Sequence, residues 1–217
     1  MTASSLPAKP LSYLALGDSY TIGEAVAVEG RWPEQLAAAL RAEGVPLAAP
    51  RIIATTGWTT DELSAAMDAA EPLGQWDFVS LLIGVNNQYR GRDVEEFRRE
   101  LRALLQRARG LAGGRAGRVL VLTIPDWGVT PFGAASGRDR TRIGAELDAY
   151  NAVVREEAER IGAPCVDIAP VSRARGGEAS MVANDGLHPS AALYAEWAAL
   201  ALPVARAALA GTTPRRP

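Results

Sequence analysis

The sequence contains a single cysteine, Cys165, and a single histidine, His188. One cysteine cannot form an intramolecular disulfide, and one cysteine with one histidine cannot supply the ligands of a Cys/His zinc site. Cys165 lies beside Val166 and Ile168 in an apolar run, which indicates a buried and unreactive thiol. These scarcities exclude disulfide-stabilised scaffolds and zinc-finger proteins.

Lysine is equally scarce, because Lys9 is the only lysine among 23 basic residues. Its place in a proline-rich leader disfavours a lysine nucleophile or Schiff base. The net charge of −2 gives no reason to expect a nucleic-acid or anionic-membrane partner. The first ten residues have no apolar h-region, and no apolar run is judged long enough to span a bilayer. We therefore expect a cytoplasmic protein without nucleic-acid or membrane partners.

What the chain does have is the composition of a globular domain, with 48% apolar and 22% charged residues among 217. This length suits one domain with a sizeable core. We expect a flexible leader over residues 1–10, a single domain over 11–210 and a flexible tail over 211–217. Nothing in the sequence indicates an oligomeric state.

Five short apolar runs alternate with segments of helical periodicity, and no hairpin signal separates them. The runs cover residues 13–16, 51–55, 78–83, 118–123 and 164–168. Run 78–83 is almost continuously apolar, as expected for a central parallel strand that is covered on both faces. The alternation predicts a three-layer α/β/α fold with a parallel sheet and helices on both faces. Pro203 is expected to kink or end the last helix.

The unusual polar residues all follow strands and precede helices. Ser19 follows the first predicted strand, Gly57 the second and Asn86 the third, whereas Asp185 and His188 follow the fifth after a longer loop. The carboxyl ends of parallel strands lie at one edge of a sheet, where ligands bind. We therefore expect these five residues to meet at that edge.

These residue types suit acyl transfer. A serine hydroxyl such as that of Ser19 becomes nucleophilic when a neighbouring base takes its proton. His188 is the only imidazole available for that role, and Asp185 could hold its other ring nitrogen. The Asn86 side chain and the backbone N–H groups of Gly57 and Ser19 could stabilise the oxyanion.

Aromatic residues after the strand ends are candidates for the walls of a substrate pocket. They are Trp58, Tyr89, Trp127 and Phe132. Such a pocket would suit a short acyl chain, an aryl ester or an acetylated sugar. Packing beneath loops is the alternative role for each of these side chains.

Four motif blocks resemble those of the SGNH, or GDSL-type, hydrolase superfamily. They are Gly17-Asp18-Ser19-Tyr20, Gly57, Gly84-Val85-Asn86-Asn87 and Asp185-Gly186-Leu187-His188-Pro189. The resemblance implies a flavodoxin-like five-stranded sheet and a serine esterase that uses neither metal nor cofactor on small-molecule esters. It also implies Ser19 as the nucleophile, Gly57 and Asn86 in the oxyanion hole, and Asp185 and His188 as the rest of a triad. Short-chain acyl or acetyl esters are the expected substrates.

The chain departs from the family pattern at two positions. Tyr20 replaces the usual leucine and leaves the nucleophile in place. Asn87 replaces the usual aspartate, which removes a charge beside Asn86 and alters the hydrogen bonding that could orient it. The Gly-x-Ser-x-Gly elbow is absent around Ser19, which disfavours the α/β-hydrolase fold.

Two other functions remain open from the residues alone. Flavodoxin-like sheets also bind flavin or phosphate at this edge, and residues 19–23 could cradle a phosphate with backbone N–H groups. Against such a binding module, the sequence has neither a P-loop nor a Gly-x-Gly-x-x-Gly motif. A catalytically inactive scaffold is the third possibility. A yellow purified protein would indicate flavin, whereas turnover of a simple ester would indicate a hydrolase.

Overall fold

The computed structural model describes residues 9–210. The predicted tail 211–217 and most of the predicted leader 1–10 lie outside the described residues. Within them, the five strands form one sheet in the order β2-β1-β3-β4-β5, and every neighbouring pair is parallel. The strands coincide with the five predicted runs: β1 (Tyr13–Gly17), β2 (Arg51–Ala54), β3 (Phe78–Leu82), β4 (Val119–Leu122) and β5 (Cys165–Val166). The predicted flavodoxin-like sheet is thereby confirmed.

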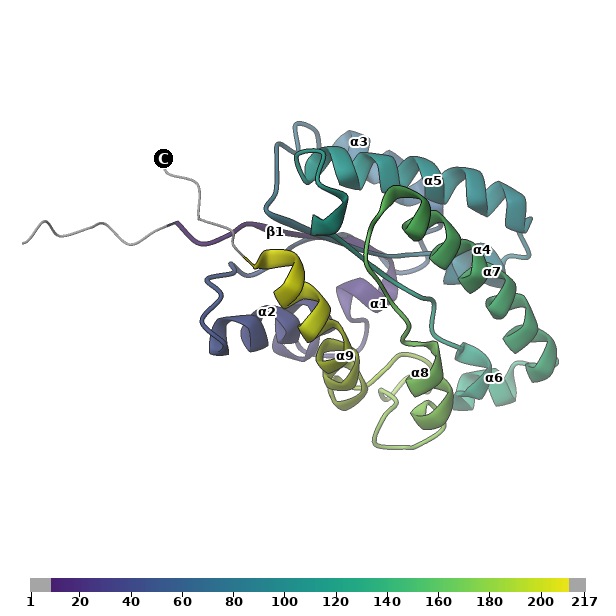
Figure 1. Cartoon of the computed structure of the whole chain (residues 1–217). Coiled ribbons are helices and arrows are strands. Elements are labelled where there is room, and N and C mark those ends of the chain that lie inside the picture. The colour runs from purple at the N-terminus through teal and green to yellow at the C-terminus, as the bar shows by residue number, and fades with distance from the viewer. Residues whose placement is uncertain (1–8, 211–217) are drawn as a thin grey trace, which may run out of the picture.

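Helices cover both faces of the sheet (Figure 1). On one face α2 (Trp32–Ala42) packs against α9 (Ala191–Leu209), and on the other α5 (Val94–Leu111) packs between α3 (Thr60–Ala69) and α7 (Arg140–Ile161). Shorter helices occupy the connections: α1 (Ser19–Ile22), α4 (Val85–Tyr89), α6 (Pro131–Ala135), α8 (Ala169–Arg175) and the 3-10 turns η1 (Val28–Gly30), η2 (Ala116–Arg118) and η3 (Trp127–Val129). The segment 125–139, which leads from β4 to α7, therefore contains η3 and α6.

The sequence pattern explains this layering. Every residue of β1, β3 and β4 is buried, as near-continuous apolar strands between two helical layers require. The buried residues of α5 form one stripe: Phe97, Leu101, Leu104, Leu105 and Ala108. At the start of α3, Thr59 and Glu62 form a capping box.

Helix α9 corrects the expectation about membrane spans and excludes one of the two effects expected of Pro203. Its 19 residues and mean hydropathy of 1.2 give it the length and composition of a membrane span, so the expectation that no segment qualifies is wrong. Within the protein, 39% of this apolar stretch is buried. Its core-facing stripe accounts for the apolar composition: Leu193, Tyr194, Trp197, Ala198, Ala201, Ala205 and Leu209. The helix also continues through Pro203 to Leu209 rather than ending there.

The strand order locates the crevice of the sheet. Successive crossovers run in opposite directions from β1, because β2 lies on one side of it and β3 on the other. Open α/β sheets bind ligands outside the carboxyl ends of the strands at such a switch point. Ser19 follows β1 and Asn86 follows β3, so these two residues flank the crevice.

Candidate active site

Ser19 is the first residue of α1, immediately beyond the carboxyl end of β1. The preceding Asp18 caps this helix, because its carboxylate accepts a hydrogen bond from the Tyr20 N–H at 3.0 Å. A Cβ atom at Gly17 would overlap the side chain of Thr21 and the carbonyl oxygen of Leu82. Glycine is therefore required for the tight turn that brings the serine to the sheet edge.

Asp18 is a second titratable group beside Ser19. Its side chain is buried. Burial raises the pKa of the Asp18 carboxyl to about 7, although hydrogen bonds from backbone N–H groups, including that of Tyr20, act in the opposite direction. This carboxyl therefore changes its charge near neutral pH, next to the candidate nucleophile.

His188 and Asp185 are paired in the loop between α8 and α9. The His188 Nδ1 lies 2.6 Å from the Asp185 Oδ2, and the Asp185 Oδ1 accepts the backbone N–H groups of Leu187 and His188 at 2.9 Å each. Burial by itself would raise the pKa of Asp185, but these hydrogen bonds hold it below the ordinary value of 3.8. An ionised carboxylate at Nδ1 keeps a proton on that nitrogen and leaves Nε2 as an acceptor.

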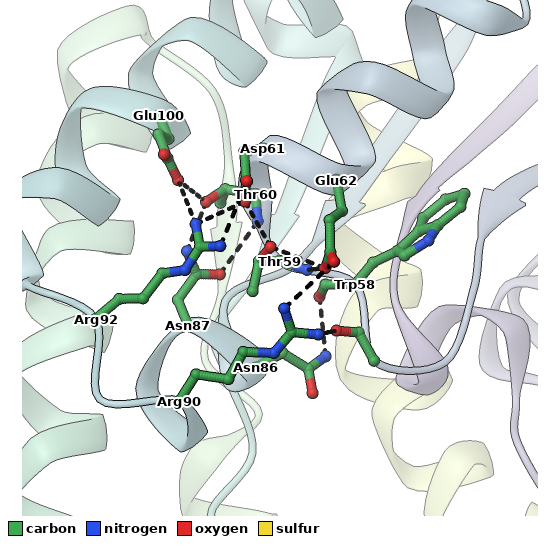
Figure 2. A network of polar contacts seen from close by, with 11 residues as sticks. Trp58, Thr59, Thr60, Asp61, Glu62, Asn86, Asn87, Arg90, Arg92 and Glu100 are labelled. Atoms are coloured by element: carbon green, nitrogen blue, oxygen red, sulfur yellow. Dashed lines mark hydrogen bonds and ion pairs between the residues drawn. The ribbon is translucent and has the colours of Figure 1, made fainter.

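Gly57 and Asn86 lie on neighbouring segments of the crevice. Gly57 has a φ of +88° in the loop between β2 and α3, a backbone conformation that side chains disfavour. Asn86, in α4, donates a hydrogen bond from its Nδ2 to the Trp58 carbonyl oxygen at 2.9 Å (Figure 2). Because Nδ2 carries two hydrogens, one remains to be directed at a ligand.

Asn87 serves a different purpose from its neighbour. Its Oδ1 accepts the backbone N–H of Thr60 at 3.1 Å, and its Nδ2 donates to the Thr60 Oγ1 at 2.6 Å (Figure 2). These bonds fasten α4 to the first residue of α3. The carbonyl of Trp58, and not residue 87, thus orients the Asn86 amide, so the aspartate usual at position 87 is not needed for that orientation.

One pocket brings the candidate residues together. Its volume is about 210 Å³, and Ser19, Gly57, Asn86 and His188 all line it. Asp185 joins this group through its hydrogen bond to His188.

Three of the four predicted aromatic residues also line this pocket. The Trp127 ring lies 5.3 Å from that of Tyr89 and 6.0 Å from that of Phe132, measured between centroids. The fourth, Trp58, is partly buried and packs against the hydrophobic core instead. Its main contribution to the site is the carbonyl group that receives the Asn86 amide.

The pocket has further wall residues that the sequence analysis did not single out. They are Tyr20, Thr56, Val85 and Leu187. Tyr20 and Leu187 directly adjoin Ser19 and His188 in the chain, which was the available signal.

Comparison with known proteins agrees with the fold and the site. Residues 15–196 match the model of the GDSL-like Lipase/Acylhydrolase family, and no curated protein matches the chain. The structure of TesA is similar with a TM-score of 0.72 and 20% identity, covering 91% of this chain and 99% of TesA. A lipase/acylhydrolase from Enterococcus faecalis has a TM-score of 0.69 and 21% identity, covering 95% of this chain and 100% of its own.

A third similar structure is Axe2, an acetylxylan esterase from Geobacillus stearothermophilus. Its TM-score is 0.66 and its identity 19%, and the match covers 97% of this chain and 99% of Axe2. At these identities the three structures show a shared fold. The family match covers most of the domain, including the blocks around Ser19, Gly57, Asn86 and His188, and confirms the predicted resemblance. The chain therefore belongs to the GDSL-like lipase/acylhydrolase family and is an esterase-type enzyme of that family.

Proposed function

We propose that the enzyme cleaves short-chain acyl or acetyl esters through an acyl-enzyme on Ser19, with His188 as general base and Asp185 as its orienting partner. The observation that carries this proposal is the pocket that joins Ser19, Gly57, Asn86 and His188. The 2.6 Å contact between His188 and Asp185 supports the same assignment. Family membership favours this hydrolase over a flavin- or phosphate-binding module.

In the proposed mechanism, the Ser19 Oγ attacks the ester carbonyl carbon while the His188 Nε2 takes the serine proton. The negative charge on the carbonyl oxygen is stabilised by the N–H groups of Ser19 and Gly57 and by the Asn86 Nδ2. The C–O bond to the alcohol then breaks, and His188 returns the proton to the leaving oxygen. Water repeats the sequence on the acyl-enzyme, which releases the acid and regenerates Ser19.

The dimensions of the pocket support a small substrate. Its volume of about 210 Å³ lies below the range of roughly 300–1,000 Å³ that is typical of sites for drug-sized ligands. Tyr89 and Phe132 are exposed large hydrophobic residues of its wall, whereas Trp127 is buried. Aromatic faces of this kind suit an acyl methyl group, an aryl group or a sugar ring.

Acyl-chain preference tests this proposal directly. In a series of p-nitrophenyl esters, we expect kcat/KM to be highest for acetyl and butyryl and to fall for decanoyl and palmitoyl esters. Acetylated oligosaccharides and acyl thioesters should be included in the panel to distinguish the acceptor classes. A higher kcat/KM on palmitoyl than on acetyl esters would contradict a small-ester specificity.

A substitution at Tyr20 tests whether this side chain limits the length of the acyl chain. Its side chain lines the pocket and also a nearly filled apolar cavity of about 10 Å³, together with Trp127, Leu193 and Trp197. Tyr20→Leu should join the two spaces and shift the optimum to longer chains. The gain in kcat/KM should be about fourfold for each further methylene that becomes buried, equivalent to about 0.8 kcal/mol. Phe132→Leu, which does not border the inner cavity, is the control, and an unchanged chain-length profile in Tyr20→Leu would exclude this boundary role.

Asn86→Ala tests the oxyanion hole. Loss of one donor typically costs about 100- to 1,000-fold in turnover, so kcat should fall by that factor while KM changes little. Steady-state kinetics on the acetyl ester provide both constants. An effect confined to KM would instead assign Asn86 to substrate binding.

A further inference from the structure

Arg90 joins the end of α4 to the loop that carries Gly57, and the mechanism above does not use it. Its Nη2 donates to the Gly57 carbonyl oxygen at 2.6 Å, and its Nη1 lies 3.3 Å from the Glu62 Oε1. Figure 2 shows the guanidinium between the Glu62 carboxylate and the loop that leads to Trp58. Arg90 thus holds the carbonyl group of a residue whose N–H is a candidate oxyanion-hole donor.

Hydrogen bonds hold the residues on either side of Gly57, since the Thr56 hydroxyl donates to Glu24 and the Trp58 carbonyl accepts the Asn86 amide. The bond from Arg90 is the one made to Gly57 itself. Glycine is the residue with the greatest backbone freedom, and here it adopts a φ of +88°. The adjacent Trp58 N–H reaches the Thr55 carbonyl only at 3.3 Å, close to the upper limit of a hydrogen bond. The bond from Arg90 is shorter and charge-assisted, and bonds of that kind are about twice as strong as neutral ones.

Glu62 holds the guanidinium in position. Its Oε2 accepts the Thr59 N–H at 2.8 Å and the Thr59 Oγ1 at 2.9 Å, which fixes the carboxylate at the start of α3. Its Oε1 is then directed at Arg90. An arginine suits this geometry because two of its nitrogens can reach two separate acceptors, whereas a lysine ammonium is a single point charge.

We propose that Arg90 is a positioning residue for the oxyanion hole, which sets the direction of the Gly57 N–H by holding the Gly57 carbonyl. This inference rests on the proposed function, in which that N–H stabilises the oxyanion. The side chains of Arg90 and Glu62 are 43% and 40% exposed, so their ion pair contributes little to fold stability. Loss of Arg90 should therefore appear in turnover rather than in stability.

Arg155 offers a matched control. It pairs with Asp167 at the same 3.3 Å, with side chains 47% and 43% exposed, and it does not line the pocket. Arg155→Ala should keep the wild-type kcat. Arg90→Ala should lower kcat about 10- to 100-fold with KM almost unchanged, because misplacement by about 1 Å can cost about 100-fold and outright loss of a donor up to about 1,000-fold. Thermal midpoints of the two variants should agree.

Two further readouts separate positioning from a general structural effect. Affinity for a boronic acid that mimics the tetrahedral intermediate should fall in Arg90→Ala in parallel with kcat. Added guanidinium, far below denaturing concentrations, should restore part of the activity of Arg90→Ala but none of that of Asn86→Ala. Arg90→Lys should retain intermediate activity, because the ammonium can still donate to the Gly57 carbonyl.

The inference is overturned if Arg90→Ala keeps the kcat of Arg155→Ala, or if its loss of activity is matched by a lowered thermal midpoint and guanidinium restores nothing. Ser19→Ala distinguishes this failure from failure of the proposed function. An inactive Ser19→Ala beside a fully active Arg90→Ala contradicts only the role of Arg90. An active Ser19→Ala contradicts both.

Discussion

Ser19→Ala is expected to lose essentially all ester hydrolysis, because the proposed acyl-enzyme forms on the hydroxyl group that this substitution removes. The loss in kcat should be on the order of 10⁶-fold, as found when the nucleophile of a serine-protease triad is removed. The fold should be unaffected, since the Ser19 side chain takes no part in the hydrogen bonds of the Asp18 cap. Hydrolysis of an acetyl ester measures the loss.

A fluorophosphonate probe identifies the nucleophile independently. The wild-type protein should gain one phosphonyl group on the peptide that contains Ser19, and Ser19→Ala should gain none. Ser136→Ala is the control, because the Ser136 hydroxyl donates a hydrogen bond to the Gly133 carbonyl and does not line the pocket. Full turnover by Ser19→Ala, or labelling of another serine, would contradict the assignment of the nucleophile.

Removal of His188 should be almost as severe as removal of Ser19, because His188 is the only histidine in the chain. His188→Ala is expected to be nearly inactive with an unchanged circular dichroism spectrum. Asp185→Asn should be milder, costing up to about 10⁴-fold in kcat if the pair behaves as in a serine protease. An asparagine could keep the two backbone bonds at Oδ1, but its amide would face the His188 Nδ1 as a donor. The ring would then carry its proton on Nε2, which is the wrong tautomer for a base.

The pH profile tests the same pair. Activity should rise with pH, because the imidazole must lose its proton before it can accept that of Ser19. Ionisation of Asp185 does not account for this rise, since its pKa lies below the ordinary value of 3.8. Retention of more than a few per cent of kcat in His188→Ala would exclude His188 as the base, because loss of a general base typically costs about 100- to 10,000-fold.

Asp18 is the group that could complicate this profile, so Asp18→Asn is the necessary control. Burial raises the pKa of the Asp18 carboxyl from 3.8 to about 7, so its charge changes near neutral pH. A raised pKa in the folded state means that the free energy of unfolding falls as pH increases from the ordinary value towards 7. The acid limb of activity should persist in Asp18→Asn, whereas this pH dependence of stability should disappear.

The sheet could be predicted because each strand is recognisable from its own short apolar run. Residues 78–83 form an almost unbroken apolar run, and such a run between two helical layers has few other possible structures. Short helices could not be predicted in the same way. α4 has five residues and α1 has four, so neither completes enough turns to show a helical period.

The candidate site was predictable where the chemistry is rare and not where it depends on tertiary contacts. The single histidine, three residues after Asp185, and the serine that follows the first strand can be recognised from the sequence alone. The hydrogen bond from Asn86 to the Trp58 carbonyl and that from Arg90 to the Gly57 carbonyl join segments that are separate in the chain. Arginine is abundant here, and nothing in its local sequence distinguishes Arg90 from the others. Trp58 was predicted as a possible pocket residue but packs against the hydrophobic core, because the direction of its side chain also depends on tertiary contacts.

The order of the elements has a consequence for synthesis of the enzyme. The candidate nucleophile Ser19 follows β1, the first strand of the chain, whereas His188 follows β5 and lies just before α9. During synthesis Ser19 therefore emerges from the ribosome long before His188. The face of α2 that packs against α9 stays uncovered until α9 has been made. A chain released before residue 185 carries a serine without a base. Under the proposed mechanism, incomplete products should therefore not hydrolyse esters, and measured activity should come only from chains that include α9.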